Sequence, residues 1–354
     1  PLLLMFSLSL LAKDDQIAKE TEKDVNLGKE YVEGLEKEIT LSTDEALIER
    51  VNKIGQALAK IANENHVPAT YGDNRHFKFD YVFKVVDDDD VNAFSIPGGF
   101  IYVNKGLLSF VESDDELAGV LAHEIAHASH RHLHALVRDR SKADLWTIPI
   151  IIGALLKGGE GAGGIVLAGS LMRTALTSGW TQKAETDADK TGFMYLLKSE
   201  YHPVALLTFL ERLEFRDRFS LGILRTHPPS SERVLALRKL LAENNIPIER
   251  SKVTTSFRAM YEVIDSDVVV KFGQRELFKL SGEEPETRAK TAIEVLNEFF
   301  DNNPQLFDVR VRGNTLYVKR NAVIEFKNTD KTKPNTAMDN IKNALFSLMI
   351  RTEG

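Results

Sequence analysis

Two histidines four positions apart, with a glutamate directly after the first, are the residues of this chain best suited to metal chemistry. The run His123-Glu124-Ile125-Ala126-His127 follows the H-E-x-x-H pattern. Residues four apart lie on one face of an α-helix, so both imidazoles can reach one ion while Glu124 stands beside them. We therefore predict one zinc ion per chain, with His123 and His127 as ligands and Glu124 as the base that activates a water molecule.

A catalytic zinc ion needs a third protein ligand and an open fourth position. The form of the motif with a third histidine would place it ten residues after His123, but that residue is Leu133. His130 would lie about 10 Å from His123 along a continuous helix, too far to share one tetrahedral ion. The third ligand is therefore expected from a later part of the chain.

Two carboxylates one helical turn apart are the candidates for that ligand. Glu185 and Asp189 belong to the run A-E-T-D-A-D at 184–189, and this spacing puts them on one face of a helix. We predict that Glu185 is the third ligand and that Asp189 accepts a hydrogen bond from the far ring nitrogen of a ligand histidine. The competing interpretation is an ordinary acidic face of a solvated helix.

Helices and a small sheet are expected to position these residues. Ser113 and Glu116 form an S-x-x-E capping box, which predicts a helix that continues through the histidines to about Val137. Further helices are predicted over 14–41, 43–62 and 180–197, and strands over 77–86 and 100–103. The fold class indicated is α+β and mainly helical, with a small sheet beside the active-site helix.

The composition excludes several other classes of protein. Hydrophobic residues make up 43% and charged residues 27% of the 354 residues, a balance typical of a folded globular chain. The net charge of −7 argues against a nucleic-acid partner, since such binding depends on clustered Lys and Arg. The sequence has no cysteine, so a disulfide, a thiolate metal site and a lipoprotein anchor are not expected.

The two ends of the chain differ in character from its middle. Residues 1–12 form an apolar run of the length of a signal-peptide core, too short to cross a bilayer, so we expect export, with the periplasm as the compartment, and no membrane span. Residues 14–248 are predicted to form the metal-binding domain. Strand-like runs, a helix, a hairpin and a last helix follow, so 252–354 is predicted to be a small α+β domain of unknown role that binds an unknown protein partner.

Four sequence blocks in a fixed order carry a resemblance to a known family. They are N-A-F-S-I-P-G-G at 92–99, the H-E-I-A-H motif, E-T-D-A-D at 185–189 and T-H-P-P-S-S-E-R-V at 226–234. This set resembles metallopeptidase family forty-eight, which includes CAAX prenyl endopeptidases, HtpX-type membrane proteases and exported bacterial peptidases. The resemblance covers roughly residues 20–245 and implies a zincin-type fold in an exported member of the family.

The resemblance also implies roles for residues outside the zinc motif. His227 would face the metal, either to stabilise an oxyanion or to occupy the open position in a latent state, and Arg233 would pair with a nearby carboxylate. The block at 92–99 would lie at the edge of the cleft, where an exposed strand can bind an extended peptide. The substrate-binding residues expected there are Asn92, Ala93, Phe94, Ser95, Gly98 and Gly99. No metal is assigned to His130, His132 or His134, which are expected at the surface or behind the ligands.

These observations lead to one expected function and two rivals. The expectation is a zinc-dependent endopeptidase that hydrolyses misfolded or envelope proteins. The rivals are a zinc-bearing chaperone or binding protein with gated proteolysis, and a structural protein with a coincidental motif. The apolar segment 145–156 is interpreted as a lid, a core hairpin or a peripheral membrane contact.

Overall fold

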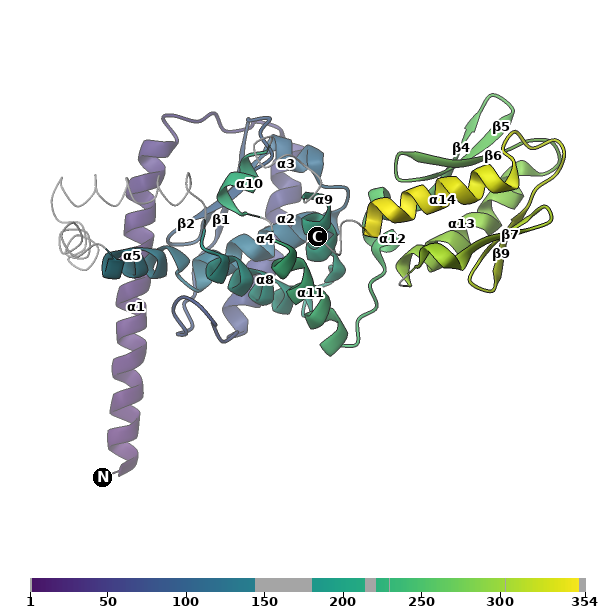
Figure 1. Cartoon of the computed structure of the whole chain (residues 1–354). Coiled ribbons are helices and arrows are strands. Elements are labelled where there is room, and N and C mark those ends of the chain that lie inside the picture. The colour runs from purple at the N-terminus through teal and green to yellow at the C-terminus, as the bar shows by residue number, and fades with distance from the viewer. Residues whose placement is uncertain (1, 144–179, 214–220, 229, 303, 350–354) are drawn as a thin grey trace. The chain divides into compact units, whose positions relative to one another are not determined.

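The computed structural model describes residues 2–143, 180–213, 221–228, 230–302 and 304–349 (Figure 1). The chain divides into two units, Pro1–Leu237 and Arg238–Gly354. The sequence placed the boundary between 248 and 252, whereas this division falls inside helix α11 (Ser231–Glu243). Because α11 continues across this division, the amino-acid composition does not change there. The change of pattern that the sequence analysis used follows the proline at 247.

The N-terminal unit is mainly helical, with one three-stranded sheet (Figure 1). Its helices are α1 (Leu2–Leu35), α2 (Glu45–Glu64), α3 (Lys105–Phe110), α4 (Asp114–Ser129), α5 (His132–Ala143), α8 (Gln182–Leu196), α9 (Val204–Leu213), α10 (Gly222–Thr226) and α11. Its strands are β1 (Val82–Val86), β2 (Ala93–Ile96) and β3 (Phe100–Asn104). The predicted α+β class, with a small sheet beside the helix of the zinc motif, is confirmed.

Helix α4 is the centre of this unit. It begins where the capping box predicted, because the Ser113 side chain accepts a hydrogen bond of 3.1 Å from the Glu116 backbone N–H. Its side chains are buried without interruption from Glu116 to Ser129. It packs against α2, α8, α9 and β2, so the residues of the H-E-x-x-H motif lie in the interior of the unit.

Strand β2 forms an edge of the sheet, whose order is β1-β3-β2. β2 pairs antiparallel with β3, with Ala93 opposite Val103 and Ser95 opposite Ile101. Asn104 donates a hydrogen bond of 3.0 Å to the carbonyl of Asn92, directly opposite it. Bonded and non-bonded pairs alternate in an antiparallel ladder, so the backbone groups of Ala93 and Ser95 point away from β3, toward an edge with which no described strand pairs.

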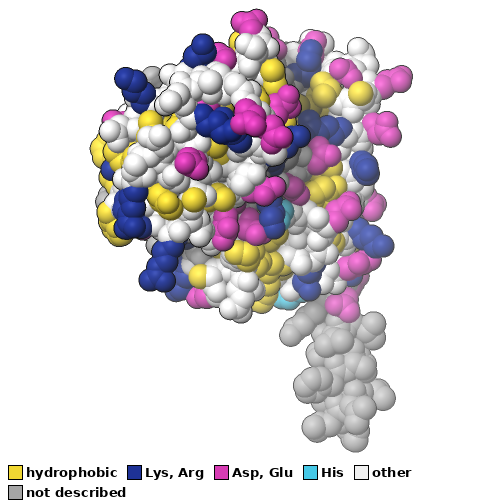
Figure 2. Space-filling view, turned by 90° about the vertical axis from the view of Figure 1, so that its right-hand side faces the viewer, with side chains coloured by type: hydrophobic (Ala, Val, Ile, Leu, Met, Phe, Trp, Pro, Cys, Tyr) yellow, Lys and Arg dark blue, Asp and Glu magenta, His cyan; other side chains and the backbone are white. Residues whose placement is uncertain are grey.

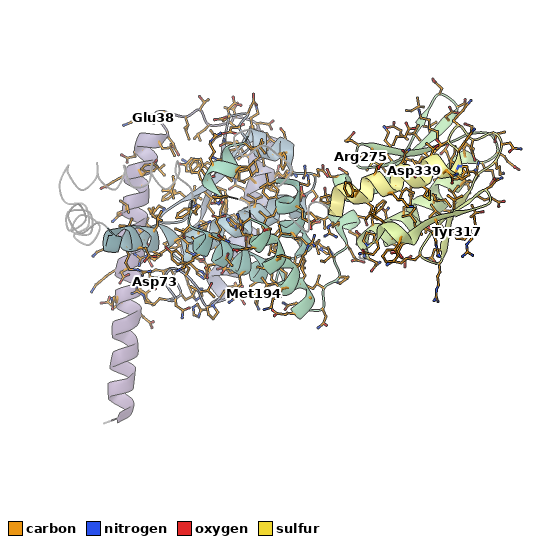
Figure 3. The ribbon with its side chains drawn as sticks, in the orientation of Figure 1. Glu38, Asp73, Met194, Arg275, Tyr317 and Asp339 are labelled. Carbon is orange, nitrogen blue, oxygen red and sulfur yellow. The ribbon has the colours of Figure 1, made fainter. Side chains whose placement is uncertain are left out.

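The prediction of one helix from Ser113 to Val137 is wrong. Helix α4 ends at Ser129, Arg131 adopts a left-handed conformation with φ of 52°, and α5 begins at His132. Arg131 is held there by ion pairs of 2.6 Å with both Glu20 and Asp24 of α1 and by Asp73 at 3.3 Å (Figure 3, where Asp73 is labelled). These partners are distant in sequence, so the local helical pattern carried no sign of the break.

The C-terminal unit consists of two halves with the same order of elements, three strands followed by a helix. The first half contains β4 (Ala259–Ile264), β5 (Asp267–Phe272), β6 (Arg275–Leu280) and α13 (Pro285–Asp301). The second contains β7 (Val309–Arg312), β8 (Thr315–Val318), β9 (Asn321–Glu325) and α14 (Pro334–Met349). Short helices α12 (Arg250–Val253), η1 (Thr255–Phe257) and η2 (Leu306–Asp308) complete the described part. Helix α13 packs on β4, β5 and β9, and α14 packs on β6, β7 and β8.

The sequence missed the third strand of each half, β6 and β9. Each pairs with its neighbour across a register shift, and in each of them two successive residues are buried, Leu277 with Phe278 and Val323 with Ile324. A bulge breaks the alternation of buried and exposed residues. The period-two pattern that marks a strand is therefore absent from both segments.

Several expectations concern surfaces and membranes. Within the described residues, every helix is too short or too polar to cross a bilayer. Residues 2–12 of the apolar run form the first part of α1, which continues to Leu35. The interpretation of this run as part of a signal peptide stays a prediction. The segment 145–156 lies outside the described residues. On the face shown in Figure 2, acidic and basic side chains are interspersed rather than gathered by sign.

Candidate active site

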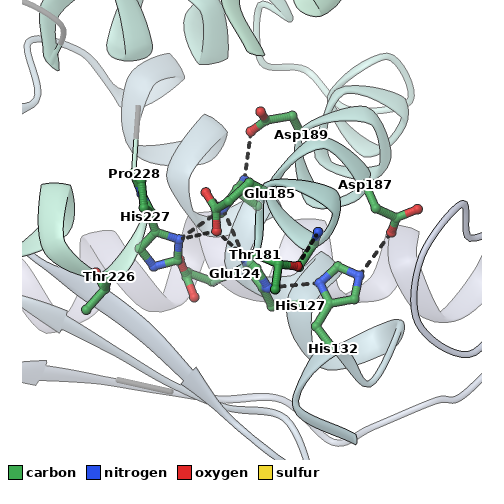
Figure 4. Close-up of polar contacts among 12 residues, drawn as sticks. Glu124, His127, His132, Thr181, Glu185, Asp187, Asp189, Thr226, His227 and Pro228 are labelled. Atoms are coloured by element: carbon green, nitrogen blue, oxygen red, sulfur yellow. Dashed lines mark hydrogen bonds and ion pairs between the residues drawn. The ribbon is translucent and has the colours of Figure 1, made fainter. Parts of the chain in front are cut away.

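The H-E-x-x-H residues of α4 meet a carboxylate from α8 in the interior of the N-terminal unit. His123 Nε2 lies 3.0 Å from His127 Nε2, and Glu185 places its carboxylate oxygens 3.6 Å from His123 Nε2 and 3.3 Å from His127 Nε2. All three side chains are buried. Two imidazole nitrogens and a carboxylate thus converge on one point, as Figure 4 shows for His127 and Glu185.

His227, which follows the short helix α10, joins this group. Its Nδ1 lies 3.1 Å from Glu185 Oε1 and 3.3 Å from His123 Nε2, and its Nε2 lies 3.3 Å from Glu124 Oε1. One donor atom from each of His123, His127, Glu185 and His227 lies within 4.8 Å of the others. The structure therefore brings His227 close enough to take a fourth position around an ion.

Two further residues compensate the buried charge of this group. Asp189 Oδ1 lies 2.9 Å from His123 Nδ1, and Arg233 binds Asp189 through two nitrogens at 2.7 and 2.8 Å. The same guanidinium reaches Glu185 Oε2 at 2.6 Å. Burial alone would raise the pKa of Glu185, but Arg233 and the neighbouring histidines hold it well below its usual range. Glu185 is therefore negatively charged in this buried site and is suited to bind a cation.

Glu124 is fully enclosed next to these residues. Burial raises the pKa of its carboxyl group against the opposing charges of His227 and His123, and Ser95 of β2 hydrogen-bonds to it. Its Oε2 has no hydrogen-bond partner among the described residues. A buried oxygen without a partner is costly, so this atom faces a place where a further donor, such as a water molecule, fits.

A second buried cluster lies directly behind His127. His132 Nδ1 is 2.9 Å from His127 Nδ1, and His132 Nε2 is 3.1 Å from Asp187 Oδ2 (Figure 4). Burial would raise the pKa of Asp187, but hydrogen bonds from His130 and His132 hold it far below its usual range. From the sequence we expected His130 and His132 either at the surface or behind the ligands. Both are buried, so neither lies at the surface.

Asp187 and Trp180 were not predicted as site residues from the sequence. The signal for Asp187 was its place in E-x-D-x-D, where the middle carboxylate faces the other side of the helix from its two neighbours. Trp180 stacks on the His127 ring with centroids 4.4 Å apart, and no spacing rule connects it with the motif.

The donor set fits a zinc ion. Two imidazoles and one carboxylate are a usual protein ligand set for catalytic zinc, with a fourth position left for water or substrate. The far nitrogen of each imidazole has a buried partner, Asp189 for His123 and His132 for His127, as ligand histidines require. The partnerless Glu124 Oε2 beside them agrees with this assignment.

Some of the residues expected to bind substrate lie beside the catalytic group in the structure, and others lie away from it. Asn92 and Ser95 lie at the site, since Asn92 Oδ1 accepts a hydrogen bond of 3.2 Å from Thr226 and Ser95 bonds to Glu124. Ala93 is fully buried beside them, and Phe94 stacks on Tyr102.

The two glycines of this block lie away from the site. A Cβ on Gly98 would lie 2.6 Å from Val25 of α1, and one on Gly99 would lie 2.8 Å from Phe79. Both have positive φ, 85° and 89°, which favours glycine. They form the turn that returns the chain to β3, packed between α1 and Phe79.

An H-E-x-x-H helix closed by a carboxylate from a second helix defines the class of the protein as a metallopeptidase. The chain belongs to peptidase family M48, whose model matches residues 49–241. The family resemblance seen in the sequence is therefore confirmed.

Curated relatives share this family. The beta-barrel assembly-enhancing protease of Escherichia coli K12 is 30% identical over 219 residues, which cover 60% of this chain and 42% of that protein. Its putative counterpart from Vibrio cholerae is 26% identical over 277 residues, 73% of this chain and 53% of that protein. The mitochondrial metalloendopeptidase OMA1 of Schizosaccharomyces pombe is 30% identical over 170 residues, 47% of this chain and 48% of that protein. The chain thus spans about half the length of these relatives.

Proposed function

We propose that this chain is a zinc-dependent endopeptidase that hydrolyses peptide bonds in polypeptide substrates. The observation that carries the proposal is the convergence of His123 Nε2, His127 Nε2 and the Glu185 carboxylate, with Glu124 beside them. In this assignment His123, His127 and Glu185 hold one zinc ion. When bound, zinc supplies Lewis-acid polarisation of the scissile carbonyl and makes a water molecule more acidic.

The side chains of this site would divide the remaining work. Glu124 takes a proton from the attacking water at its carboxylate and returns it to the leaving amine nitrogen. His227, whose Nε2 lies 3.3 Å from Glu124 Oε1, donates a hydrogen bond to the oxyanion that develops on the substrate carbonyl. Arg233 and Asp189 keep Glu185 and His123 in position.

Strand β2 would bind the substrate backbone. The backbone groups of Ala93 and Ser95 point to the open edge of the sheet, and the Ser95 side chain reaches Glu124. An extended peptide added at such an edge places its backbone beside the catalytic carboxylate with little demand on its sequence. This mode suits a protease of misfolded or envelope proteins.

Compartment and physiological substrate are part of the same proposal. The Escherichia coli relative is named for enhancing beta-barrel assembly, and the run at 1–12 has the length of a signal-peptide core. Together they support an exported, periplasmic enzyme of the bacterial envelope. The acidic net charge supports protein rather than nucleic acid as its partner.

The test separates zinc binding from catalysis. Glu124→Gln should keep one zinc per chain and lose casein cleavage by at least about 100-fold, because general base catalysis is removed. Glu185→Ala should lose zinc as well, and Glu64→Gln, an exposed glutamate of α2, should change neither. Zinc content and casein cleavage are measured on each purified protein; a Glu124→Gln variant that still cuts casein contradicts the mechanism.

A second candidate is a zinc-bearing chaperone or binding protein whose proteolysis is gated. It is favoured by the position of His227, with Nδ1 3.1 Å from Glu185 Oε1 and 3.3 Å from His123 Nε2. There the ring can fill the position that a substrate needs. Wild-type protein that carries one zinc and does not cut casein supports this candidate over the first.

A further inference from the structure

A continuous row of buried polar contacts leads from His127 to Asp187 on α8. His127 Nδ1 lies 2.9 Å from His132 Nδ1, and His132 Nε2 lies 3.1 Å from Asp187 Oδ2. Both His132 and Asp187 are fully buried. None of these atoms belongs to the set that faces the proposed metal position, which His127 meets with its other ring nitrogen, Nε2.

The direction of every hydrogen bond in this row follows from Asp187. Its Oδ1 accepts from the Thr70 backbone N–H, from Thr70 Oγ1 at 2.6 Å and from the Tyr71 backbone N–H at 3.1 Å. Its Oδ2 accepts from His130 Nδ1 at 2.5 Å and from His132 Nε2. A carboxylate accepts only, so His132 carries its proton on Nε2.

The proton position on His132 determines the one on His127. A neutral imidazole with its proton on Nε2 has a lone pair on Nδ1, and the 2.9 Å contact between the two Nδ1 atoms needs one proton between them. His127 must then donate from Nδ1 to His132 Nδ1. The proton of His127 is thereby kept away from Nε2, which is left with a lone pair.

We infer that His132 and Asp187 form a positioning relay that fixes the tautomer of His127, so that its Nε2 is ready to bind the metal. This inference rests on the proposed function, since it concerns a metal held by His127. His123 has a carboxylate directly beside it, since Asp189 Oδ1 lies 2.9 Å from its Nδ1. For His127, the side chain of His132 lies between the ligand ring and the carboxylate of Asp187.

The cluster of His130, His132 and Asp187 is not itself a metal site. His130 Nε2 faces the carbonyl of Val67 at 3.0 Å while its Nδ1 faces Asp187, so both of its ring nitrogens lie against oxygen acceptors. Both oxygens of Asp187 are engaged by several donors. Donors, rather than lone pairs, therefore fill the interior of this cluster.

The break between α4 and α5 is what places the relay. The left-handed Arg131 lets the residues on either side of it, His130 and His132, both turn toward Asp187. Gly72, with φ of 100°, covers the break so closely that a Cβ would lie 2.2 Å from the His130 carbonyl oxygen and 2.9 Å from the His132 ring. A continuous helix, as the sequence suggested, would not bring both histidines to one carboxylate.

The test reverses the direction of the relay with Asp187→Asn. Three donors from Thr70 and Tyr71 face Oδ1, so they hold the amide oxygen on their side, and the two hydrogens of the amide NH₂ face His130 and His132. His132 must then accept at Nε2 and donate from Nδ1, which moves the proton of His127 to Nε2. We expect zinc affinity to fall at least about 10-fold, in a protein that is still folded by circular dichroism.

The readouts are zinc affinity, by competition with a chromophoric chelator, and the tautomer of His127, by ¹⁵N NMR of the metal-free full chain with labelled histidine. Thr70→Val is the matched control, because it removes a hydrogen bond from the same carboxylate without reversing the relay. It should keep wild-type zinc affinity. Expected tautomers of His127 are a proton on Nδ1 in the wild type and on Nε2 in Asp187→Asn.

A second pair of variants tests the relay in case the Asp187→Asn protein does not fold. His132→Asn keeps an acceptor near the former Nδ1 and should retain most of the zinc affinity, whereas His132→Gln keeps only the contact with Asp187 and should lose at least about 10-fold. A wild-type His127 proton on Nε2, or equal zinc affinity in these variants and the wild type, overturns the relay. Wild-type protein that binds no zinc overturns the proposed function instead, and the tautomer measurement still decides the relay.

Discussion

At the scale of single residues, helix α8 presents three carboxylates to three different partners. Glu185 faces the metal position, Asp189 binds His123 and Arg233, and Asp187 binds His130 and His132. Successive residues are about 100° apart around an α-helix, so Glu185 and Asp189 share a face while Asp187 points away from it. One short acidic run therefore supports both ligand histidines of α4.

Arg233 compensates the negative charge of two of these buried carboxylates, Glu185 and Asp189. Arg233→Met should destabilise the metal-free protein by about 3–5 kcal/mol, because it leaves Glu185 and Asp189 buried without their compensating charge. The free energy of unfolding is measured in urea after removal of metal. Arg50→Met, which removes the partly exposed pair with Asp114, should cost about 0–1 kcal/mol; equal losses in the two variants would contradict this account.

The residues that touch the proposed metal were accessible to sequence reasoning, and those behind them were less so. His123, His127 and Glu185 follow from helical spacing together with the chemistry of zinc. The contact between His132 and Asp187 depends on the helix break at Arg131, which no local pattern encodes. His227 and Arg233 lie in a separate block at 226–234, and only the family resemblance connected that block with the site.

At the scale of elements, α1 is attached to the active-site helix by charge. Arg131 binds Glu20 and Asp24, Arg75 binds Glu20 through two hydrogen bonds of 2.8 and 2.7 Å, and the Arg131 guanidinium lies 4.6 Å from the Phe77 ring centroid. The break between α4 and α5 is thus supported from a helix far away in the sequence. From the sequence this segment was predicted only as a helix, because local spacing does not identify partners that lie far away in the chain.

This attachment should depend on pH through Glu20. Hydrogen bonds from Arg75 lower the pKa of Glu20 from 4.5 to about 2 in the folded protein. A carboxyl group with a lowered pKa stabilises the fold above its unfolded value and loses this effect as the pH falls toward its folded value. The stability lost in Glu20→Gln should therefore be constant above pH 4.5 and shrink between pH 4.5 and about 2.

Urea unfolding of wild type and Glu20→Gln across this range measures the effect. Glu22→Gln changes an exposed residue of the same helix and should show little difference from wild type at any pH. A loss of stability in Glu20→Gln that stays the same down to pH 2 would show that packing, and not the ion pairs of Glu20, attaches α1.

At the scale of the whole molecule, the chain consists of two units with separate interiors. The core of the C-terminal unit is formed by buried side chains from both of its sheets and from α13 and α14. The proposed zinc ligands and their supporting residues all belong to the N-terminal unit. The C-terminal unit therefore has its own source of stability, and the proposed chemistry belongs to the N-terminal unit.

A fragment of residues 246–354 should fold by itself. We expect a cooperative thermal transition and a dispersed NMR spectrum, since its apolar core is formed without the other unit. The complementary protein that ends at residue 248 should keep one zinc and its activity toward casein. A fragment 246–354 without a cooperative transition would contradict the division into separate units.

The crossed packing of the C-terminal unit has a consequence for the order of synthesis. Helix α13 needs β9 as a neighbour, and α14 needs β6 of the half that precedes it. As the chain leaves the ribosome, the N-terminal unit is complete once α11 has emerged, but α13 must wait for a strand that is made after it. During that interval the part of its apolar face that packs on β9 is open to chaperones and to other nascent chains.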